Sequence, residues 1–207
     1  MTKQIARQDG PRESRKREIV ALAAIHFLRD GFADANLDNI VKDCACSKAT
    51  LYAYFGNKTG LFEAVVNQEI TTDNAFFIDH TVPFVEALEA YTSRALALMT
   101  APQTIALARL VIAEASRYPE IAASFDRATR RRHLQTLTDY LAAKQSVDEL
   151  PDFDPGSAAL VLAGLLMQTT PISNLLGTSG PIPARDCRRR AAVAVSQFIK
   201  IYGLQAA

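Results

Sequence analysis

The chain has 207 residues, of which 49% are hydrophobic and 22% are charged. These values lie close to globular averages and exclude a wholly disordered chain, and the length allows one large domain or two small ones. The net charge is only +1. Residues 1–58 hold ten Lys or Arg against seven Asp or Glu, a net of +3, whereas the rest holds thirteen against fifteen, a net of −2. A mildly basic front end is typical of a surface that faces phosphates.

Other classes of protein are disfavoured by what the sequence lacks. No apolar run is long enough for a transmembrane helix, and residues 1–20 contain no apolar segment of a secretory signal. The three cysteines do not suggest a disulfide framework, and no Cys/His spacing resembles a zinc site. We therefore expect a bacterial-type cytoplasmic protein with no membrane partner, no cofactor and no metal.

The first predicted element is a polar arm over residues 1–13, followed by a helix that begins near Ser14. This helix is expected to end at Asp30, because Gly31 can take the left-handed conformation that closes a helix. Its apolar side chains recur at helical spacing: Ile19, Leu22, Ala23, His26 and Phe27. We expect His26 on this stripe to be a packing residue with satisfied polar atoms rather than a ligand.

Three short helices are predicted next. One is capped by Asn36, the second spans Lys48–Phe55 and is capped by Ser47, and the third begins after Asn57 and runs to about Asn74. Longer helices with prolines near their starts are expected over about 83–99, 103–118, 120–144, 154–170 and 184–202. Pro171 is expected to disrupt or end the fourth of these, with a loop over residues 172–183.

The segment with the most functional information is residues 36–55, NLDNIVKDCACSKATLYAYF. Two short helices separated by a tight turn predict a helix-turn-helix, in which the second helix enters the major groove with its N-terminal residues. That N-terminus also attracts phosphate through its free N–H groups and its dipole. Tyr52 and Tyr54 cannot share one face, so we expect one to pack locally and the other to reach a phosphate. Lys58 opens the next helix and is expected to contact a flanking phosphate.

The front of the chain, over about residues 14–70, resembles the TetR family of bacterial regulators. The residues that carry the resemblance are Ala23, Phe27, Gly31-Phe32, Ile40, Ser47-Lys48-Ala49-Thr50-Leu51-Tyr52-Ala53-Tyr54-Phe55, Lys58 and Leu61. Two positions depart from the family pattern: Ala45-Cys46 stands where Gly-Val is usual, and Gly60 where an acidic residue is common. The segment 106–125 is similar to the regulatory domain of TetR proteins related to efflux-pump repressors, the AcrR-like members.

The resemblance implies an all-α fold: an N-terminal three-helix helix-turn-helix DNA-binding domain over 13–73, then a C-terminal helical ligand-binding and dimerisation bundle over 74–207. It implies a transcriptional repressor that binds a palindromic double-stranded DNA operator as a homodimer and is released by a small lipophilic effector. The expected DNA-binding residues are Asn36, Ser47, Lys48, Ala49, Thr50, Tyr52, Tyr54 and Lys58.

Broadly apolar rear helices can fill a core or line a ligand cavity. The expected effector-pocket residues are Tyr91, Met99, Arg109, Glu114, Tyr118, Phe125 and Met167. Glu114 interrupts an apolar stripe, and two roles remain open for it: contact with a cationic effector, or an ion pair with an internal arginine such as Arg109, which is favoured.

The helices over 154–170 and 184–202 carry many small and apolar residues. These could belong to an intrachain core, but the family favours a four-helix dimer interface with a second copy. The expected interface residues are Leu162, Leu166, Ala191, Val195, Phe198 and Tyr202.

Cys44 and Cys46 flank the turn of the helix-turn-helix. Cys44 is expected to be a core residue, and redox sensing by the pair is the less favoured alternative, since nothing in the sequence indicates a lowered thiol pKa. Two other functions compete with that of a DNA-binding regulator. An enzyme is disfavoured because no catalytic constellation or phosphate-binding loop is present, whereas a ligand-independent DNA-organising protein on the same scaffold stays open.

Overall fold

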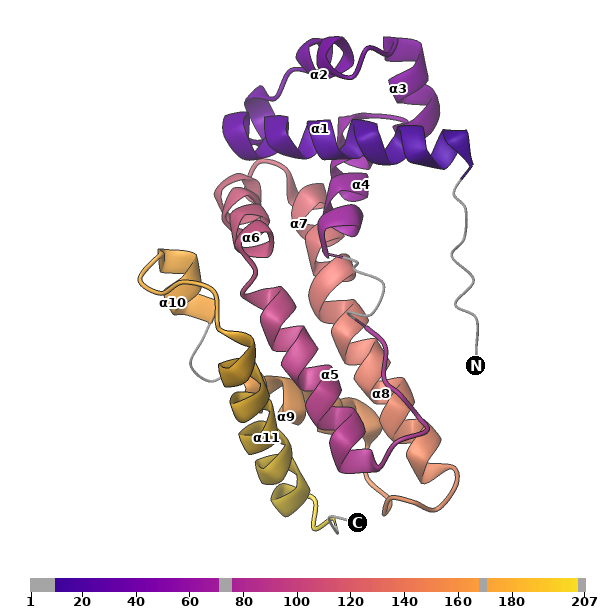
Figure 1. Ribbon diagram of the computed structural model, residues 1–207, viewed down its shortest axis with the longest axis vertical. Coiled ribbons are helices and arrows are strands. Elements are labelled where there is room, and N and C mark those ends of the chain that lie inside the picture. The colour runs from indigo at the N-terminus through magenta and orange to yellow at the C-terminus, as the bar shows by residue number, and fades with distance from the viewer. Residues whose placement is uncertain (1–9, 71–75, 168–170, 205–207) are drawn as a thin grey trace.

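The computed structural model describes residues 10–70, 76–167 and 171–204, and every regular element in these ranges is a helix (Figure 1). The front helices are α1 (Pro11–Asp34), α2 (Leu37–Asp43), α3 (Lys48–Phe55) and α4 (Lys58–Ile70). The rear helices are α5 (Phe84–Met99), α6 (Pro102–Glu114), α7 (Pro119–Asp126), the π-helical turn η1 (Arg127–Arg131), α8 (Arg132–Gln145), α9 (Pro155–Met167), α10 (Pro171–Leu176) and α11 (Ala184–Ile201). The all-α prediction is confirmed.

The helices form two ends joined by α4, α6 and α7 (Figure 1). At one end α1 lies across the molecule with α2 and α3 on its outer side. At the other end α5 packs against α11, α8 against α9, and α9 against α11. Between the ends, α6 contacts α1, and α7 contacts α4. The front helices are therefore held against the rear ones by helix packing as well as by the chain itself.

The short front helices begin at the residues that the sequence predicts as caps. The Asn36 side chain accepts a hydrogen bond from the Asp38 N–H at 2.7 Å, and the Ser47 hydroxyl accepts from the Thr50 N–H at 3.0 Å. The Asn57 side chain accepts from the Gly60 N–H at 2.8 Å. Each cap satisfies an N–H that has no partner within its helix. The predicted starts of all three helices are thus confirmed.

Gly31 interrupts α1 where the sequence predicts its end. Its φ is +81°, which an L side chain rarely adopts, but a short helical segment follows and continues to Asp34. The predicted stop is therefore a kink rather than an end. Phe27 before the kink and Phe32 after it stack with ring centroids 5.8 Å apart. The kink thus turns Phe32 back into the core, where it is buried.

The core of the front helices continues into the rear ones. Phe62 on α4 meets the ring of Phe32 edge-on at 5.4 Å, and Tyr118 meets the other side of Phe32 at 4.9 Å. Leu107, Val111 and Ile121 of α6 and α7 are buried in the same cluster. The helix-turn-helix is not a separate packing unit, because side chains of α6 and α7 belong to its core. The predicted domain boundary itself, between residues 73 and 74, lies outside the described residues.

A second core joins α5, α8, α9 and α11. Its buried side chains include Tyr91, Leu137, Leu162, Val195 and Phe198. No single helix in the described residues is long and apolar enough to cross a membrane, although the bent pair α5 and α6 passes that test of length and composition when taken together.

Two rear predictions need correction. The expected helix over 120–144 begins at Pro119 and contains the π-helical turn η1 between α7 and α8. The expected loop over 172–183 is wrong at its start, since α10 spans Pro171–Leu176. A proline lacks only an N–H that the first turn of a helix does not use, so Pro171 starts a helix here. The predicted helix end at residue 170 lies outside the described residues.

Candidate nucleic-acid interface and regulatory domain

The helix α3 has one buried face and one exposed face. Leu51 is buried in the front core, whereas Lys48, Ala49 and Tyr52 are exposed. Tyr52 lies beside both Lys48 and Ala49 on the helix surface, because it follows them by four and three residues. The hydroxyls of Ser47 and Thr50 lie 2.9 Å apart at the start of the helix. The exposed face of α3 thus carries hydroxyl groups, a cation and a tyrosine, which are side chains that contact phosphates and base edges.

Lys48 is paired with an acidic residue of α2. Its Nζ lies 2.6 Å from the Asp38 carboxylate, and this hydrogen bond raises the pKa of Lys48. Both side chains are more than half exposed, so water and salt screen the pair. A phosphate can therefore replace the carboxylate as the partner of Lys48.

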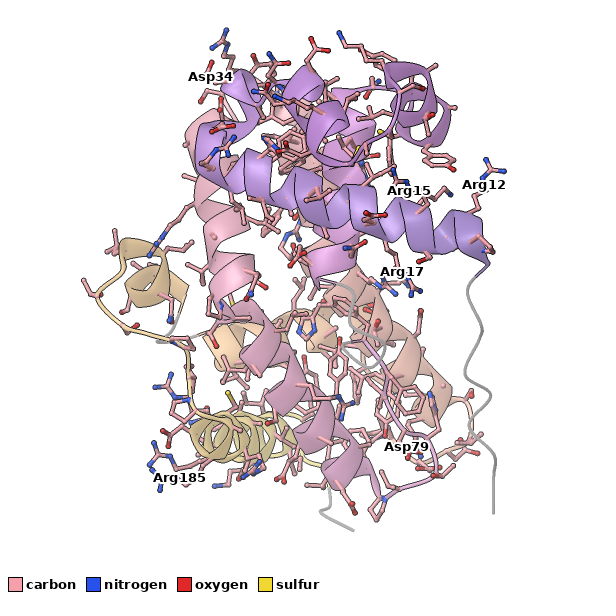
Figure 2. The ribbon with its side chains drawn as sticks, turned by 45° about the horizontal axis from the view of Figure 1, so that its top comes forward. Arg12, Arg15, Arg17, Asp34, Asp79 and Arg185 are labelled. Carbon is pink, nitrogen blue, oxygen red and sulfur yellow. The ribbon has the colours of Figure 1, made fainter. Side chains whose placement is uncertain are left out.

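Tyr54 lies beneath the basic first half of α1. Its ring is half-buried, with the Arg12 guanidinium 5.5 Å and the Lys16 ammonium 5.9 Å from the ring centroid. Figure 2 shows Arg12, Arg15 and Arg17 along this half of α1. Of the two tyrosines, Tyr54 is the one that packs locally and Tyr52 is the exposed one, at 46%. The contact also places cations of α1 beside α3.

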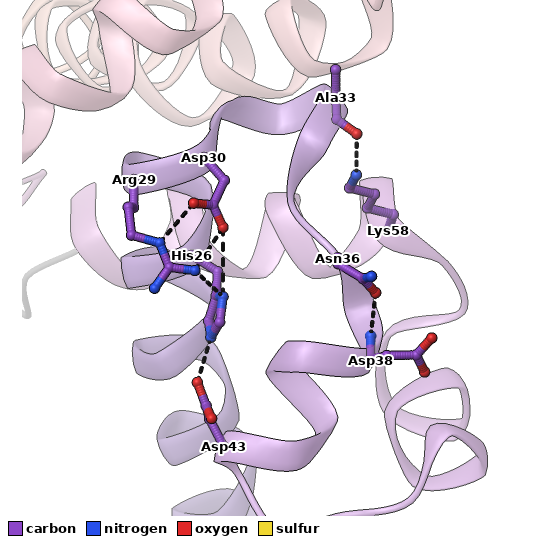
Figure 3. A network of polar contacts seen from close by, with 8 residues as sticks. All are labelled: His26, Arg29, Asp30, Ala33, Asn36, Asp38, Asp43 and Lys58. Atoms are coloured by element: carbon purple, nitrogen blue, oxygen red, sulfur yellow. Dashed lines mark hydrogen bonds and ion pairs between the residues drawn. The ribbon is translucent and has the colours of Figure 1, made fainter.

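His26 joins α1 to α2 in a hydrogen-bonded network (Figure 3). Its Nδ1 lies 3.0 Å from the Arg29 guanidinium, which can only donate, so Nδ1 accepts. Its Nε2 lies 2.8 Å from the Asp43 carboxylate and is the donor in that pair. The ring is 3% exposed. His26 is a packing residue with both nitrogens satisfied, as the sequence predicts.

Lys58 contacts the segment that follows the kink in α1. Its Nζ donates to the Ala33 carbonyl at 2.9 Å (Figure 3) and lies 5.2 Å from the Phe32 ring centroid. Partial burial lowers the pKa of Lys58. The side chain that the sequence assigns to a flanking phosphate therefore has a partner within the chain.

Glu114, the last residue of α6, contacts the same segment from the rear. Its Oε1 accepts from the Ala33 N–H at 3.0 Å. A Cβ at Gly31 would lie 3.1 Å from this oxygen, which is tighter than ordinary packing. Ala33 is thus held by Lys58 at its carbonyl and by Glu114 at its N–H. We call this arrangement the Ala33 contact.

The expected ion pair between Glu114 and Arg109 is wrong. Arg109 donates instead to the carbonyls of Leu175 at 2.8 Å and Asn174 at 2.7 Å, at the C-terminal end of α10. A cation is favourable there because the last carbonyls of a helix lack partners. Glu114 and Arg109 therefore connect helices rather than pair with each other.

Tyr91 and His133 form a buried polar pair between α5 and α8. The Tyr91 hydroxyl lies 2.7 Å from His133 Nδ1, and the two rings stack with centroids 5.2 Å apart. Burial lowers the pKa of His133 to about 4 and raises the pKa of Tyr91. Both groups are consequently neutral at physiological pH. Tyr91 is an expected pocket residue, whereas sequence reasoning missed His133 because its partner lies 42 positions away.

The other expected pocket residues do not gather around Tyr91. Tyr118 and Phe125 pack against the front core, and Met167 is partly exposed on α9. Two grooves are present elsewhere. One of about 330 Å³ is lined by Phe77, Asp79, Val82, Glu86, Ala87, Ala90 and Arg94. The other, of about 210 Å³, lies between α9 and α11 and is lined by Leu165, Leu166, Arg189, Arg190, Val193, Ala194 and Gln197. None of the seven expected pocket residues lines either groove.

Most of the expected dimer residues are buried within the single chain. Leu162, Leu166, Ala191, Val195 and Phe198 are each at most 5% exposed, and Tyr202 is half-buried. Leu162, Val195 and Phe198 belong to the core between α5, α8, α9 and α11, and Leu166 to the cluster beside it. Side chains buried in this way offer almost no surface to a second copy. The exposed apolar residues of α9 and α11 lie on the outward faces instead: Leu160, Met167, Val193 and Ile201.

An exposed, capped helix-turn-helix joined to a helical bundle defines a DNA-binding transcriptional regulator. Residues 19–65 match the family described as bacterial regulatory proteins, tetR family, and residues 86–204 match the C-terminal domain of AefR-like transcriptional repressors. The chain therefore belongs to the TetR family. The regulators of this family bind DNA and are not enzymes.

Individual relatives agree with this placement. The HTH-type transcriptional regulator UidR of Escherichia coli K12 is 26% identical over 190 residues, which cover 86% of each chain. The solved structure of the flavonoid-responsive regulator FrrA is 25% identical with a TM-score of 0.73, covering 91% of this chain and 97% of that one. A TetR-family regulator from Mesorhizobium loti MAFF303099 has a TM-score of 0.74 at 22% identity, covering 94% and 99%.

The Ala33 contact gives a first testable prediction. Glu114→Ala removes the acceptor of the Ala33 N–H, so amide hydrogen exchange at Ala33 is expected to accelerate by about tenfold, as the loss of a hydrogen bond of about 1.4 kcal/mol requires. Glu114→Gln keeps an acceptor oxygen and should restore much of the protection. Glu120→Ala, at an exposed position of α7, is the matched control. Unchanged exchange at Ala33 in Glu114→Ala would contradict the contact.

Proposed function

We propose that this regulator is a dimeric repressor that binds a palindromic DNA operator through α3 and releases it when a small lipophilic effector binds the rear domain. The observation that carries the DNA-binding part is the exposed face of α3, where Ser47, Lys48 and Tyr52 surround the start of a helix anchored by buried Leu51. As a DNA-binding regulator it would act at the nucleoid of a bacterial cytoplasm. We retain residues 13–73 and 74–207 as the DNA-binding and regulatory domains.

The proposed DNA contacts come from α3 and its surroundings. Ser47, Lys48, Ala49, Thr50 and Tyr52 would enter the major groove or bind its bordering phosphates. Asn36 would contribute near the start of α2, where its side chain already caps the helix. Tyr54 would act through Arg12 and Lys16, whose charges it places beside α3. Lys58 would support the segment around Ala33 rather than bind phosphate directly.

Substitutions at the two members of the Lys48–Asp38 ion pair are expected to change DNA affinity in opposite directions. Lys48→Ala is expected to weaken binding to all duplexes and to reduce the slope of log affinity against log salt by about one unit. Asp38→Asn is expected to strengthen binding, because it removes an anion that competes with phosphate for Lys48. Fluorescence anisotropy measures both effects on a duplex that the protein selects from a random-sequence pool.

Lys200→Ala is the matched control, because Lys200 is exposed near the far end of α11. An unchanged affinity and salt slope in Lys48→Ala would exclude Lys48 from the interface. Failure of the protein to enrich any duplex would contradict sequence-specific DNA binding altogether.

Dimerisation is proposed through the outward faces of α9 and α11. Leu160, Gly164 and Met167 recur along one face of α9, and a Cβ built at Gly164 would meet no atom within 4 Å. Val193 lies on the outward face of α11, beside the groove between the two helices. Exposed apolar side chains around a glycine allow two helices to approach closely, and a twofold axis would repeat the patch on the partner.

The dimer prediction uses exposed rather than buried residues. Leu160→Arg combined with Val193→Glu is expected to produce monomers that keep the helical content of the wild-type protein, because both side chains are more than half exposed in the single chain. Operator affinity should fall in parallel, since a palindrome is bound by two recognition helices. Sedimentation velocity measures the mass, and Ile112→Arg, at an equally exposed site on α6, should remain dimeric. An intact dimer for the double variant would locate the interface elsewhere.

The proposed effector site centres on Tyr91 and His133. They are neutral polar groups among apolar side chains of α5 and α8, and ligand sites are typically apolar with a few placed polar groups. An effector there would have to separate α5 from α8, which would shift α6 and the Ala33 contact. FrrA is described as flavonoid-responsive, which supports an aromatic, lipophilic class of effector for this chain.

Quercetin, as a flavonoid probe, is expected to raise the melting temperature of the protein and to lower its operator affinity about 5- to 150-fold, the range of typical allosteric coupling. Thermal shift and anisotropy measure the two effects, together with a panel of lipophilic drugs and metabolites.

The competing proposal is a ligand-independent DNA-organising protein on the same scaffold. The close packing around Tyr91, which is fully buried, favours it. If no compound of the panel changes operator affinity, this second proposal is preferred.

A further inference from the structure

The turn between α2 and α3 brings two thiols into contact. The Sγ atoms of Cys44 and Cys46 lie 2.7 Å apart. An S–S bond is roughly 2.05 Å long, so a shift of less than one ångström would bring the two sulfurs to bonding distance. Cys44 is 2% exposed, whereas Cys46 is only half-buried. Two thiols at this distance form a dithiol, in which Cys46 is the more exposed residue and Cys44 is the buried one.

The backbone of the turn holds the two sulfurs together. Ala45 between them has a φ of +45°, in the left-handed region that L residues adopt rarely. Arg15 of α1 donates to the Ala45 carbonyl at 3.1 Å and also to the Cys44 carbonyl. The strained residue is therefore held by a side chain from a neighbouring helix. The turn sets the position of α3, because Ser47 follows Cys46 directly and caps that helix.

We infer that Cys44 and Cys46 are a modification site, at which a small-molecule disulfide oxidises the dithiol to an intramolecular disulfide, and that this bond weakens operator binding. The bond closes a ring through the backbone of Ala45. Ring closure draws the sulfurs together and changes the torsions that Arg15 holds. The start of α3 moves with the turn, so the recognition helix no longer fits the groove.

The reaction is a thiol–disulfide exchange in two steps. The Cys46 thiolate attacks one sulfur of the small disulfide, whose S–S bond breaks and releases one small thiolate. The Cys44 thiolate then attacks Cys46 in the mixed disulfide and releases the second small thiolate. The protein loses two electrons and two protons, and the small disulfide becomes two thiols. Cys46 reacts first because it is the more exposed of the two residues.

Burial raises the pKa of Cys46 to about 11. Because the thiolate is the nucleophile, only the small fraction of protein molecules with a deprotonated Cys46 can react at neutral pH. The exchange with the small disulfide is therefore slow. The dithiol therefore responds to a sustained change in the thiol–disulfide balance rather than to a brief pulse of oxidant. Incubation at pH 8.5 until the thiol content is constant gives the equilibrium state.

The experiment uses the full chain and oxidised glutathione as the probe. On oxidation the number of free thiols in the denatured protein is expected to fall from three to one, and the intact mass should decrease by two hydrogen atoms. Cys187→Ser should form the same bond, because Cys187 lies in the rear core on α11. Cys46→Ser and Cys44→Ser should not form it. Three remaining thiols, or glutathione attached to Cys46 as the end product, would overturn the dithiol.

The effect on DNA rests on the proposed function, whereas the bond itself does not. The oxidised wild-type protein is expected to bind its selected duplex at least tenfold more weakly than the reduced protein, and a reducing thiol should restore the affinity. The same oxidation should leave the affinity of Cys46→Ser unchanged. A bonded protein with undiminished affinity would overturn the effect on DNA, while a reduced protein that binds no duplex would instead refute the proposed function.

Discussion

The packing of Phe32 between Phe62 and Tyr118 is the interaction on which the position of the recognition helix depends. Phe62 belongs to α4 and Tyr118 precedes α7, so one ring joins the front helices to the rear domain. Protein interiors are close-packed, and a small shift of one element is therefore transmitted to its neighbours. A displacement of α6 or α7 would reach α1 through this cluster and through the Ala33 contact, without any change within the helix-turn-helix itself.

Local signals made the front of the molecule predictable. Asn36 and Ser47 cap helices through bonds to residues two or three positions away, and Gly31 breaks α1 through its own backbone torsion. Such effects depend on neighbours in sequence, so they can be recognised without a structure. The starts of the two short helices of the helix-turn-helix and the break in α1 follow from them. The tyrosine pair was predictable only in part, because spacing separates Tyr52 from Tyr54 but does not say which one meets Arg12 and Lys16.

The partners of long polar side chains could not be predicted, because they come from distant positions. Glu114 meets the Ala33 N–H 81 residues away, and Arg109 meets carbonyls 65 and 66 residues away. The expected dimer residues are buried within the single chain, and the sequence could not reveal this for another reason. Both α9 and α11 carry apolar side chains on more than one face, and periodicity cannot distinguish the face that packs inside the chain from the face that remains exposed. Val195 is buried and Val193 is exposed, although both fit an apolar helix.

The distribution of charge explains why a DNA-binding surface can exist in a chain whose net charge is +1. Its cations already have partners near the interface: Lys48 has Asp38, Lys58 has the Ala33 carbonyl, and Arg15 has the turn carbonyls. Binding DNA exchanges some of these contacts for phosphates, so each new contact adds less affinity than a free cation would. In the proposed dimer, tight binding would require several contacts to form together in both copies. The position of α3, and hence the packing behind it, would then be the quantity that an effector changes.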